Sequence, residues 1–141
     1  MIRYLDTSLL VAALVREPGS ERVQTWLAAQ DPTACAISDW VVTEFSSALS
    51  IKLRNGQLAE PHRATALANF TMLATQRFAV LPVERQHFRA AARFADQHAL
   101  GLRSGDALHL AVCADQGATL CTLDRRMAQA ATALGLMTES P

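Results

Sequence analysis

An apolar helix followed by an apolar strand, each bounded by a single aspartate, is the feature that most constrains this chain. Residues 107–113 (ALHLAVC) carry almost no polar side chain, and residues 119–123 (TLCTL) follow them with a β-prone pattern. A helix that is apolar on every side is buried, and a short apolar strand is typical of a parallel sheet covered on both faces. Asp106 opens the helix and Asp124 closes the strand, so two carboxylates lie at the edges of an interior that excludes charge.

The same alternation of short strands and longer helices runs through the whole chain. Apolar runs predict five strands, at about 2–5, 34–37, 78–81, 119–123 and, at the edge, 136–138. Helical periodicity and breakers predict helices at about 9–15, 20–29, 39–54, 61–76 and 84–98, one that follows Ser104, and one before Gly135. Ser20, Ser38 and Ser104 are the expected N-caps of three of them. Strands that alternate with helices form a parallel sheet with helices on both faces.

The length of 141 residues fits one domain, and no repeat, low-complexity tract or linker divides it. We therefore predict a single α/β domain over residues 1–141. In parallel sheets, ligands bind beyond the carboxyl ends of the strands, where the strand order reverses. Asp6 follows the first predicted strand and Asp124 follows the fourth, so their carboxylates meet at that point if these strands are neighbours.

The charge of the chain gives no general support for nucleic-acid binding. Charged residues make up 18% of the chain, below the ~25% typical of soluble domains, which predicts a well-buried interior and an apolar interface. The formal net charge is zero, so any binding to phosphates needs a local patch. Arg103, Arg125 and Arg126 are the candidates because they flank Asp106 and Asp124; the alternative is that they are ordinary surface arginines.

Three cysteines lie in apolar segments and form no C-x-x-C pair: Cys35, Cys113 and Cys121. We interpret them as reduced core residues of a cytoplasmic protein. The sequence shows no N-terminal signal, because Asp6 interrupts the first apolar run, and no apolar run approaches the ~20 residues of a membrane span. No membrane association is expected.

Four acids occupy positions that need an explanation: Asp6, Glu44, Asp106 and Asp124. Glu44 shares a helix face with Val41 and Ala48, and an acid on an apolar stripe is unfavourable unless it has a partner. Each acid also has a simpler role. Asp6 and Asp124 can act as N-caps, Asp106 can be a first-turn acid favoured by the helix dipole, and Glu44 can lie at the edge of the stripe and reach water.

Carboxylates held close together raise one another's pKa and destabilise the fold, and a hard divalent cation removes that problem. Oxygen-only ligands point to Mg²⁺ or Mn²⁺, and such ions support phosphodiester hydrolysis by activating water and stabilising the leaving oxygen. The sequence shows no Ser/His/Asp or Cys/His arrangement, no phosphate-binding glycine loop and no zinc spacing. His109 shares a helix face with Asp106, and we interpret it as a buried histidine whose hydrogen bonds are satisfied.

Four segments together resemble the PIN-domain ribonucleases, and within them the VapC toxins of prokaryotic toxin–antitoxin pairs. The segments are residues 5–8 (LDTS), Glu44, residues 105–111 (GDALHLA) and residues 122–127 (TLDRRM). Their order and spacing carry the resemblance, which spans essentially the whole chain. It implies a three-layer fold with a parallel five-stranded sheet in the order 3-2-1-4-5.

The resemblance also implies function. Asp6, Glu44, Asp106 and Asp124 would form a catalytic, metal-binding quartet, with Thr7 or Ser8 supporting Asp6. The expected activity is Mg²⁺- or Mn²⁺-dependent cleavage of single-stranded RNA by a homodimer, inhibited by an antitoxin protein whose tail covers the site. The chain departs from the family pattern in two places. Met127 stands where an aromatic residue is common, and residues 104–105 (SG) replace the more usual small apolar pair.

Other functions remain open. A phospho-accepting receiver domain has a similar size and acid cluster, but it needs paired acids after strand one and a lysine after strand five, whereas Asp6 stands alone and Lys52 is within a helix. A non-catalytic RNA- or protein-binding module on the same fold is a second alternative, against which the intact quartet argues. A DNA flap-type nuclease usually needs more acids and extra clamping elements than 141 residues accommodate.

Overall fold

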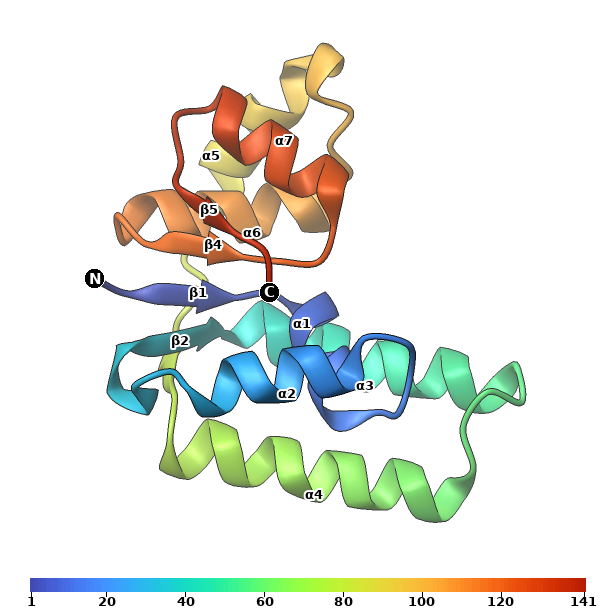
Figure 1. The fold of residues 1–141 in the computed structure, drawn as a ribbon. Helices are drawn as coiled ribbons and strands as arrows, with labels where there is room; N and C mark the ends of the chain where they lie inside the picture. The colour runs from blue at the N-terminus through green and yellow to red at the C-terminus, as the bar shows by residue number, and fades with distance from the viewer.

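A computed structural model describes all residues, 1–141, and contains one sheet of five parallel strands in the order β3-β2-β1-β4-β5 (Figure 1). The predicted fold class and strand order are therefore confirmed. The chain runs from β1 outward to β3 and then returns to the other side of β1, so the strand order reverses between β1 and β4. The strands are β1 (Arg3–Leu5), β2 (Cys35–Ser38), β3 (Ala79–Leu81), β4 (Thr119–Cys121) and β5 (Thr138–Glu139).

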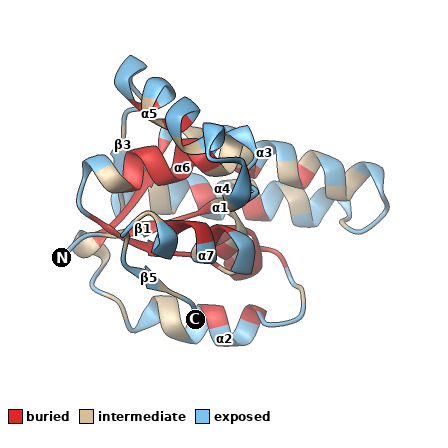
Figure 2. Cartoon of the chain, turned by 90° about the horizontal axis from the view of Figure 1, so that it is seen from above, coloured by how far each residue is buried: buried red, intermediate tan, exposed pale blue.

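Helices cover both faces of the sheet. In the two views, α3, α5 and α6 lie on one face and α2 and α7 on the other (Figures 1 and 2). Helix α4 packs on α1 and α3. The helices are α1 (Thr7–Leu14), α2 (Ser20–Ala28), α3 (Asp39–Arg54), α4 (Glu60–Gln76), α5 (Arg85–Asp96), α6 (Ser104–Asp115) and α7 (Arg125–Ala133), with 3₁₀ turns at Pro32–Ala34 and His98–Leu100.

Some local predictions were wrong in detail. The fifth strand begins at Thr138, and the helix predicted for residues 84–98 is α5 followed by a separate 3₁₀ turn. That turn ends at Gly101, whose φ of 66° is a left-handed conformation that glycine adopts without strain. Ser38 occupies the predicted N-cap position of α3 but makes no side-chain capping bond, and the N-cap residues of α2 and α6 are Gly19 and Arg103. The hydroxyl of Ser20 instead donates to Val15 O, and that of Ser38 bonds to Tyr4, because these buried groups have partners elsewhere.

The core is built around the central strand and α6. Tyr4 and Leu5 of β1 are completely buried. Every residue of α6 from Ala107 to Cys113 is buried, as expected for a helix that is apolar all round (Figure 2). Under the sheet edge, Phe45 of α3 and Phe70 of α4 stack with ring centroids 4.3 Å apart and an interplanar angle of 11°. No helix of the chain combines the length and apolarity needed to cross a membrane.

We predict that Phe70→Ala lowers the free energy of unfolding by about 3–5 kcal/mol, because it removes a ring that is 6% exposed and leaves a cavity against Phe45. Met72→Ala in the same helix is the control, since Met72 is 42% exposed and should change stability by only about 0.5 kcal/mol. Urea unfolding of both variants measures the difference. Equal losses would show that α4 is not packed as described.

Candidate functional site

The expected site lies at the carboxyl ends of β1 and β4. These strands are neighbours, with Leu5 opposite Cys121 in the parallel register. The backbone N–H of Asp6 donates to the carbonyl of Cys121 at 3.2 Å, which extends the pairing one residue beyond the strands. The prediction that strands one and four meet where the strand order reverses is confirmed. The residues that directly follow β1 and β4 therefore lie next to each other.

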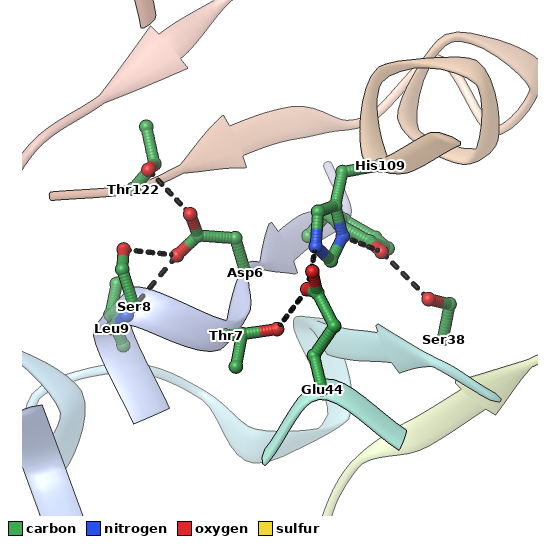
Figure 3. Close-up of polar contacts among 9 residues, drawn as sticks. Asp6, Thr7, Ser8, Leu9, Ser38, Glu44, His109 and Thr122 are labelled. Carbon is green, nitrogen blue, oxygen red and sulfur yellow. Dashed lines mark hydrogen bonds and ion pairs between the residues drawn. The ribbon is translucent and has the colours of Figure 1, made fainter. Parts of the chain in front are cut away.

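Asp6 is a buried carboxylate held by three hydrogen bonds. Its side chain is the N-cap of α1 and accepts from Leu9 N at 3.1 Å, from Ser8 Oγ at 2.7 Å and from Thr122 Oγ1 at 2.5 Å (Figure 3). Burial raises the pKa of Asp6, and the hydrogen bonds from Thr122, Ser8 and Leu9 act against that rise. Asp6 therefore performs the capping role considered for it. Ser8 bonds Asp6, as expected of a supporting residue.

Thr122 connects two of the four acids, and its role was not predicted from the sequence. Its hydroxyl donates to Asp6 and accepts from the backbone N–H of Asp124 at 3.0 Å. Thr122 is 1% exposed, and a buried hydroxyl requires partners. The sequence did contain a signal for this role: Thr122 directly follows an apolar strand and stands two residues before an acid. Through these two hydrogen bonds, Thr122 fixes the backbone of Asp124 relative to the carboxylate of Asp6.

Glu44, on the second turn of α3, forms the other part of the site. Thr7 Oγ1 donates to Glu44 Oε1 at 2.6 Å, and His109 Nε2 bonds closely to the same oxygen (Figure 3). Burial acts to raise the pKa of Glu44, but the hydrogen bonds that it accepts from His109 and Thr7 outweigh burial and lower the pKa. Thr7 thus bonds Glu44, where the resemblance offered it as a support for Asp6.

His109 is 2% exposed, and both ring nitrogens have partners, because Nδ1 lies 2.8 Å from Tyr4 Oη. The interpretation of His109 as a buried histidine with satisfied hydrogen bonds is confirmed. The sequence did not show that one of these partners is Glu44. This bond makes His109 part of the site.

Asp106 and Asp124 face each other across a small polar cavity. Its volume is about 310 Å³, and it is lined by Gly101, Arg103, Asp106, Asp124 and Arg126. Burial raises the pKa of Asp106, and the negative charges of Asp124 and Glu44 raise it further. The carboxylate of Asp124 also caps α7 by accepting from Met127 N at 3.1 Å.

The predicted arginine patch is only partly assembled at this cavity. Arg103 and Arg126 line it, whereas Arg125 does not. Both lining arginines are exposed. They supply positive charge beside the two carboxylates.

The four acids gather at one end of the sheet, but their side chains do not converge on one point. No group of three or more His, Cys, Asp or Glu side chains stands in a metal-binding cluster. Asp6 is turned toward Thr122 and Ser8, and Glu44 toward His109. The donor chemistry nevertheless fits a hard divalent cation, because Asp106 and Asp124 present carboxylates to one cavity and a cation there would offset the repulsion that raises the pKa of Asp106.

Comparisons with known proteins agree with this architecture. The family model for the PIN domain matches residues 3–133. Ribonuclease VapC46 of Mycobacterium tuberculosis is 31% identical over 147 residues, which covers 98% of this chain and 96% of the relative. The chain therefore belongs to the PIN-domain family, among the VapC-type ribonucleases.

Solved structures show the same fold at lower identity. Mycobacterium tuberculosis VapC20, described as a Sarcin-Ricin loop cleaving toxin, has a TM-score of 0.75 at 20% identity, with 99% of each chain covered. The FitAcB structure from Neisseria gonorrhoeae has a TM-score of 0.74 at 19% identity, covering 97% of this chain and 96% of that one.

The raised pKa of Asp106 gives a prediction about stability and pH. A carboxyl group whose pKa is higher in the folded state than its ordinary value of 3.8 contributes stability that is complete below pH 3.8 and falls as the pH rises through the raised value. Asp106→Asn in chelator should therefore be more stable than the wild type at pH 7, and the gap should close on acidification. Thermal melts at several pH values test this, and a variant that melts well below the wild type at pH 7 would show a structural role for the carboxylate.

Asp6→Asn is the contrasting variant. Three donors share the two oxygens of Asp6, so an amide nitrogen in place of one oxygen leaves at least one of these protons, such as the hydroxyl proton of Thr122, without its acceptor. We expect this variant to melt below the wild type in chelator, although it too removes a buried charge.

Proposed function

We propose that this chain is a Mg²⁺- or Mn²⁺-dependent endoribonuclease that hydrolyses phosphodiester bonds in single-stranded RNA. The observation that carries the proposal is the cavity in which Asp106 and Asp124 lie beside Arg103 and Arg126. The charge of Asp124 helps to raise the pKa of Asp106, a cation between the two carboxylates would offset that repulsion, and two arginines beside them suit a phosphate. The names of VapC46, a ribonuclease, and VapC20, a cleaving toxin, support RNA as the substrate.

The acidic quartet would hold the cation: Asp6, Glu44, Asp106 and Asp124. A bound divalent ion supplies an activated water and neutralises charge on the phosphate in this kind of chemistry. Thr122 and Ser8 orient Asp6 through their hydroxyl groups, and Thr7 orients Glu44. Asp124 performs two tasks, since its carboxylate caps α7 and also faces the cavity.

Asp124→Asn separates those two tasks, because asparagine caps a helix about as well as aspartate but carries no charge. In Mg²⁺, we expect near-wild-type stability and a loss of cleavage of ~10-fold or more, equivalent to ~1.4 kcal/mol of transition-state stabilisation. Cleavage of fluorescent single-stranded RNA measures it, and excess chelator should abolish cleavage by the wild type.

Asp31→Asn is the matched control. Asp31 also caps a turn through its side chain, but it is exposed and does not line the cavity of Asp106 and Asp124. It should cleave at the wild-type rate. Full cleavage by Asp124→Asn across a range of Mg²⁺ concentrations would reduce Asp124 to a cap. Full cleavage in chelator would refute the metal mechanism.

The arginines give an independent prediction about RNA binding. Replacing Arg103 and Arg126 by Ala, in the Asp106→Asn background to prevent cleavage, should weaken binding and flatten its salt dependence. The slope of log Kd against log salt should change by roughly 0.7 for each phosphate of a single strand that the protein no longer neutralises. Arg125→Ala is the control from the same helix turn and does not line the cavity. An unchanged slope in the double variant would remove the phosphate-binding role.

Two apolar grooves support the proposed protein partners. One, of about 290 Å³, lies between α3, α5 and α6 and is lined by residues that include Trp40, Ala91 and Leu108, with Phe88 at 56% exposure on its wall. An exposed aromatic beside a hollow is an arrangement that a second copy can complete reciprocally. We propose that this groove forms a homodimer interface.

The second groove, also of about 290 Å³, lies between α1, α2 and α4 and includes Leu14, Leu27 and Phe78. We propose that the antitoxin binds an apolar groove between helices and that its tail covers the acidic site. The VapBC structures from Rickettsia felis and Salmonella typhimurium, which share this fold, support such a partner. We place the complex in the cytoplasm, where three free buried cysteines stay reduced and RNA is present.

We predict that the wild type is a dimer by light scattering at tens of micromolar and that Phe88→Asp is a folded monomer, because a charge at the centre of the interface is desolvated without a partner. Met137→Asp is the control, since Met137 is 61% exposed and does not line the groove. A monomeric wild type would contradict the dimer. A dimeric Phe88→Asp would place the interface elsewhere.

A non-catalytic RNA- or protein-binding module on this fold is the remaining alternative. It predicts RNA binding without cleavage in any divalent ion, so the same cleavage assay decides between the two functions.

A further inference from the structure

A chain of hydrogen bonds runs through the interior from Ser38 to Glu44. Tyr4 Oη lies 2.7 Å from Ser38 Oγ and 2.8 Å from His109 Nδ1, and His109 Nε2 bonds Glu44 Oε1 (Figure 3). Tyr4 and Ser38 are completely buried, and His109 is 2% exposed. Because solvent does not reach these groups, each proton in the chain must have a protein acceptor.

The buried hydroxyl of Ser38 fixes the direction of these bonds. Ser38 makes no capping bond to α3, and its side chain bonds only to Tyr4. Its proton is therefore donated to Tyr4 Oη, since a buried proton without an acceptor is unfavourable. Burial raises the pKa of Tyr4, so the phenol keeps its own proton and donates it to His109 Nδ1.

The tautomer of His109 follows from these two steps. Because Nδ1 accepts a hydrogen bond, the proton of the neutral ring is on Nε2, which donates to Glu44 Oε1. The opposite tautomer, with its proton on Nδ1, would instead donate to Tyr4, turn the phenol toward Ser38 and leave the serine proton without an acceptor, and its unprotonated Nε2 would face Glu44 Oε1. Ser38 and Tyr4 thus select one neutral form of the histidine.

The two oxygens of Glu44 have different environments. Oε1 accepts from both Thr7 and His109. Oε2 makes no hydrogen bond to the protein and lies against Gly105, where a Cβ atom would be only 3.1 Å away. Gly105 directly precedes Asp106, so the free oxygen of Glu44 faces the first turn of α6 at the edge of the acidic site. The same hypothetical Cβ would lie 3.4 Å from Trp40, so the space for this carboxylate depends on glycine.

We propose that His109 is a positioning residue: as its Nε2–H tautomer, selected by Ser38 and Tyr4, it occupies one oxygen of Glu44 and holds the other free toward Asp106. Its importance for catalysis rests on the proposed nuclease function, but the tautomer and the orientation of Glu44 do not. His109 touches neither substrate nor the cavity of Asp106 and Asp124, and it acts through Glu44.

His87 provides a matched control. It is 4% exposed, its Nε2 lies 3.0 Å from Asp115, and its Nδ1 accepts from Glu84 N at 2.9 Å. It is therefore also a buried, neutral Nε2–H histidine that bonds an acid. Asp115 lies at the opposite end of α6 from Asp106. His87 therefore has the same hydrogen-bond pattern as His109 but lies outside the site.

The first measurement is the tautomer, read from two-bond ¹H–¹⁵N correlation spectra of protein labelled with ¹⁵N-histidine. At neutral pH, both His109 and His87 should show a protonated Nε2 and an unprotonated Nδ1. Tyr4→Phe removes the donor to Nδ1 and should change the pattern of His109 alone. A His109 whose Nε2 is unprotonated would overturn the proposal whatever the activity of the protein.

The second measurement is Mn²⁺ affinity by isothermal titration calorimetry, in the absence of RNA. His109→Leu should bind Mn²⁺ at least ~10-fold more weakly than the wild type, the size of effect expected when an orienting partner of a ligand is removed. His109→Gln, which keeps an N–H donor near the position of Nε2, should recover most of the affinity, and His87→Leu should leave it unchanged.

Equal Mn²⁺ affinity in His109→Leu and the wild type would overturn the positioning role. So would equal losses in His109→Leu and His87→Leu, which would indicate general destabilisation. If the wild type binds no Mn²⁺, the metal-dependent function fails, and the tautomer spectra alone decide this inference. If His109→Leu does not fold, the affinity of Tyr4→Phe replaces it, and an unchanged value with a changed tautomer would equally refute the proposal.

Discussion

The site depends on the burial of one carboxylate, Asp6, at the carboxyl end of the central strand. Asp6 is 2% exposed and accepts hydrogen bonds from α1 and from Thr122, which follows β4. A buried carboxylate is tolerated only where such donors replace water. The donors that stabilise it therefore also fix the end of β1 against α1 and β4, and thereby the place where the other acids gather.

Two networks extend from this point. Thr122 joins Asp6 to the backbone of Asp124, whose carboxylate faces Asp106 across the cavity. On the other side, Thr7 follows Asp6 directly and bonds Glu44, which His109 holds from α6. Each acid is oriented by neutral donors, and Arg103 and Arg126 lie beside only two of them. The negative charge at this end of the sheet is thus organised but not neutralised, which is the condition that favours a divalent cation.

The fold and the four acids were predictable because they depend on local patterns. Apolar runs marked the strands, and an apolar helix with one acid at its start marked α6, although the strand order came from the family resemblance. The orientation of the side chains was not predictable. The bond between Tyr4 and His109 joins residues 105 positions apart, and nothing in the sequence near Ser38 distinguishes a helix cap from a partner of Tyr4. Thr7 or Ser8 was expected to support Asp6. Ser8 does so, whereas Thr7 bonds Glu44, because the first turn of α1 points its hydroxyl toward α3.

Anomalous diffraction from crystals of the protein grown with Mn²⁺ tests the central claim most directly, because it locates the cation without reference to activity. The account predicts an anomalous peak beside Asp106 and Asp124 at the carboxyl ends of β1 and β4, and no such peak in crystals of Asp106→Asn. A well-ordered wild-type structure in saturating Mn²⁺ without a peak at these carboxylates, or with one elsewhere only, would contradict it.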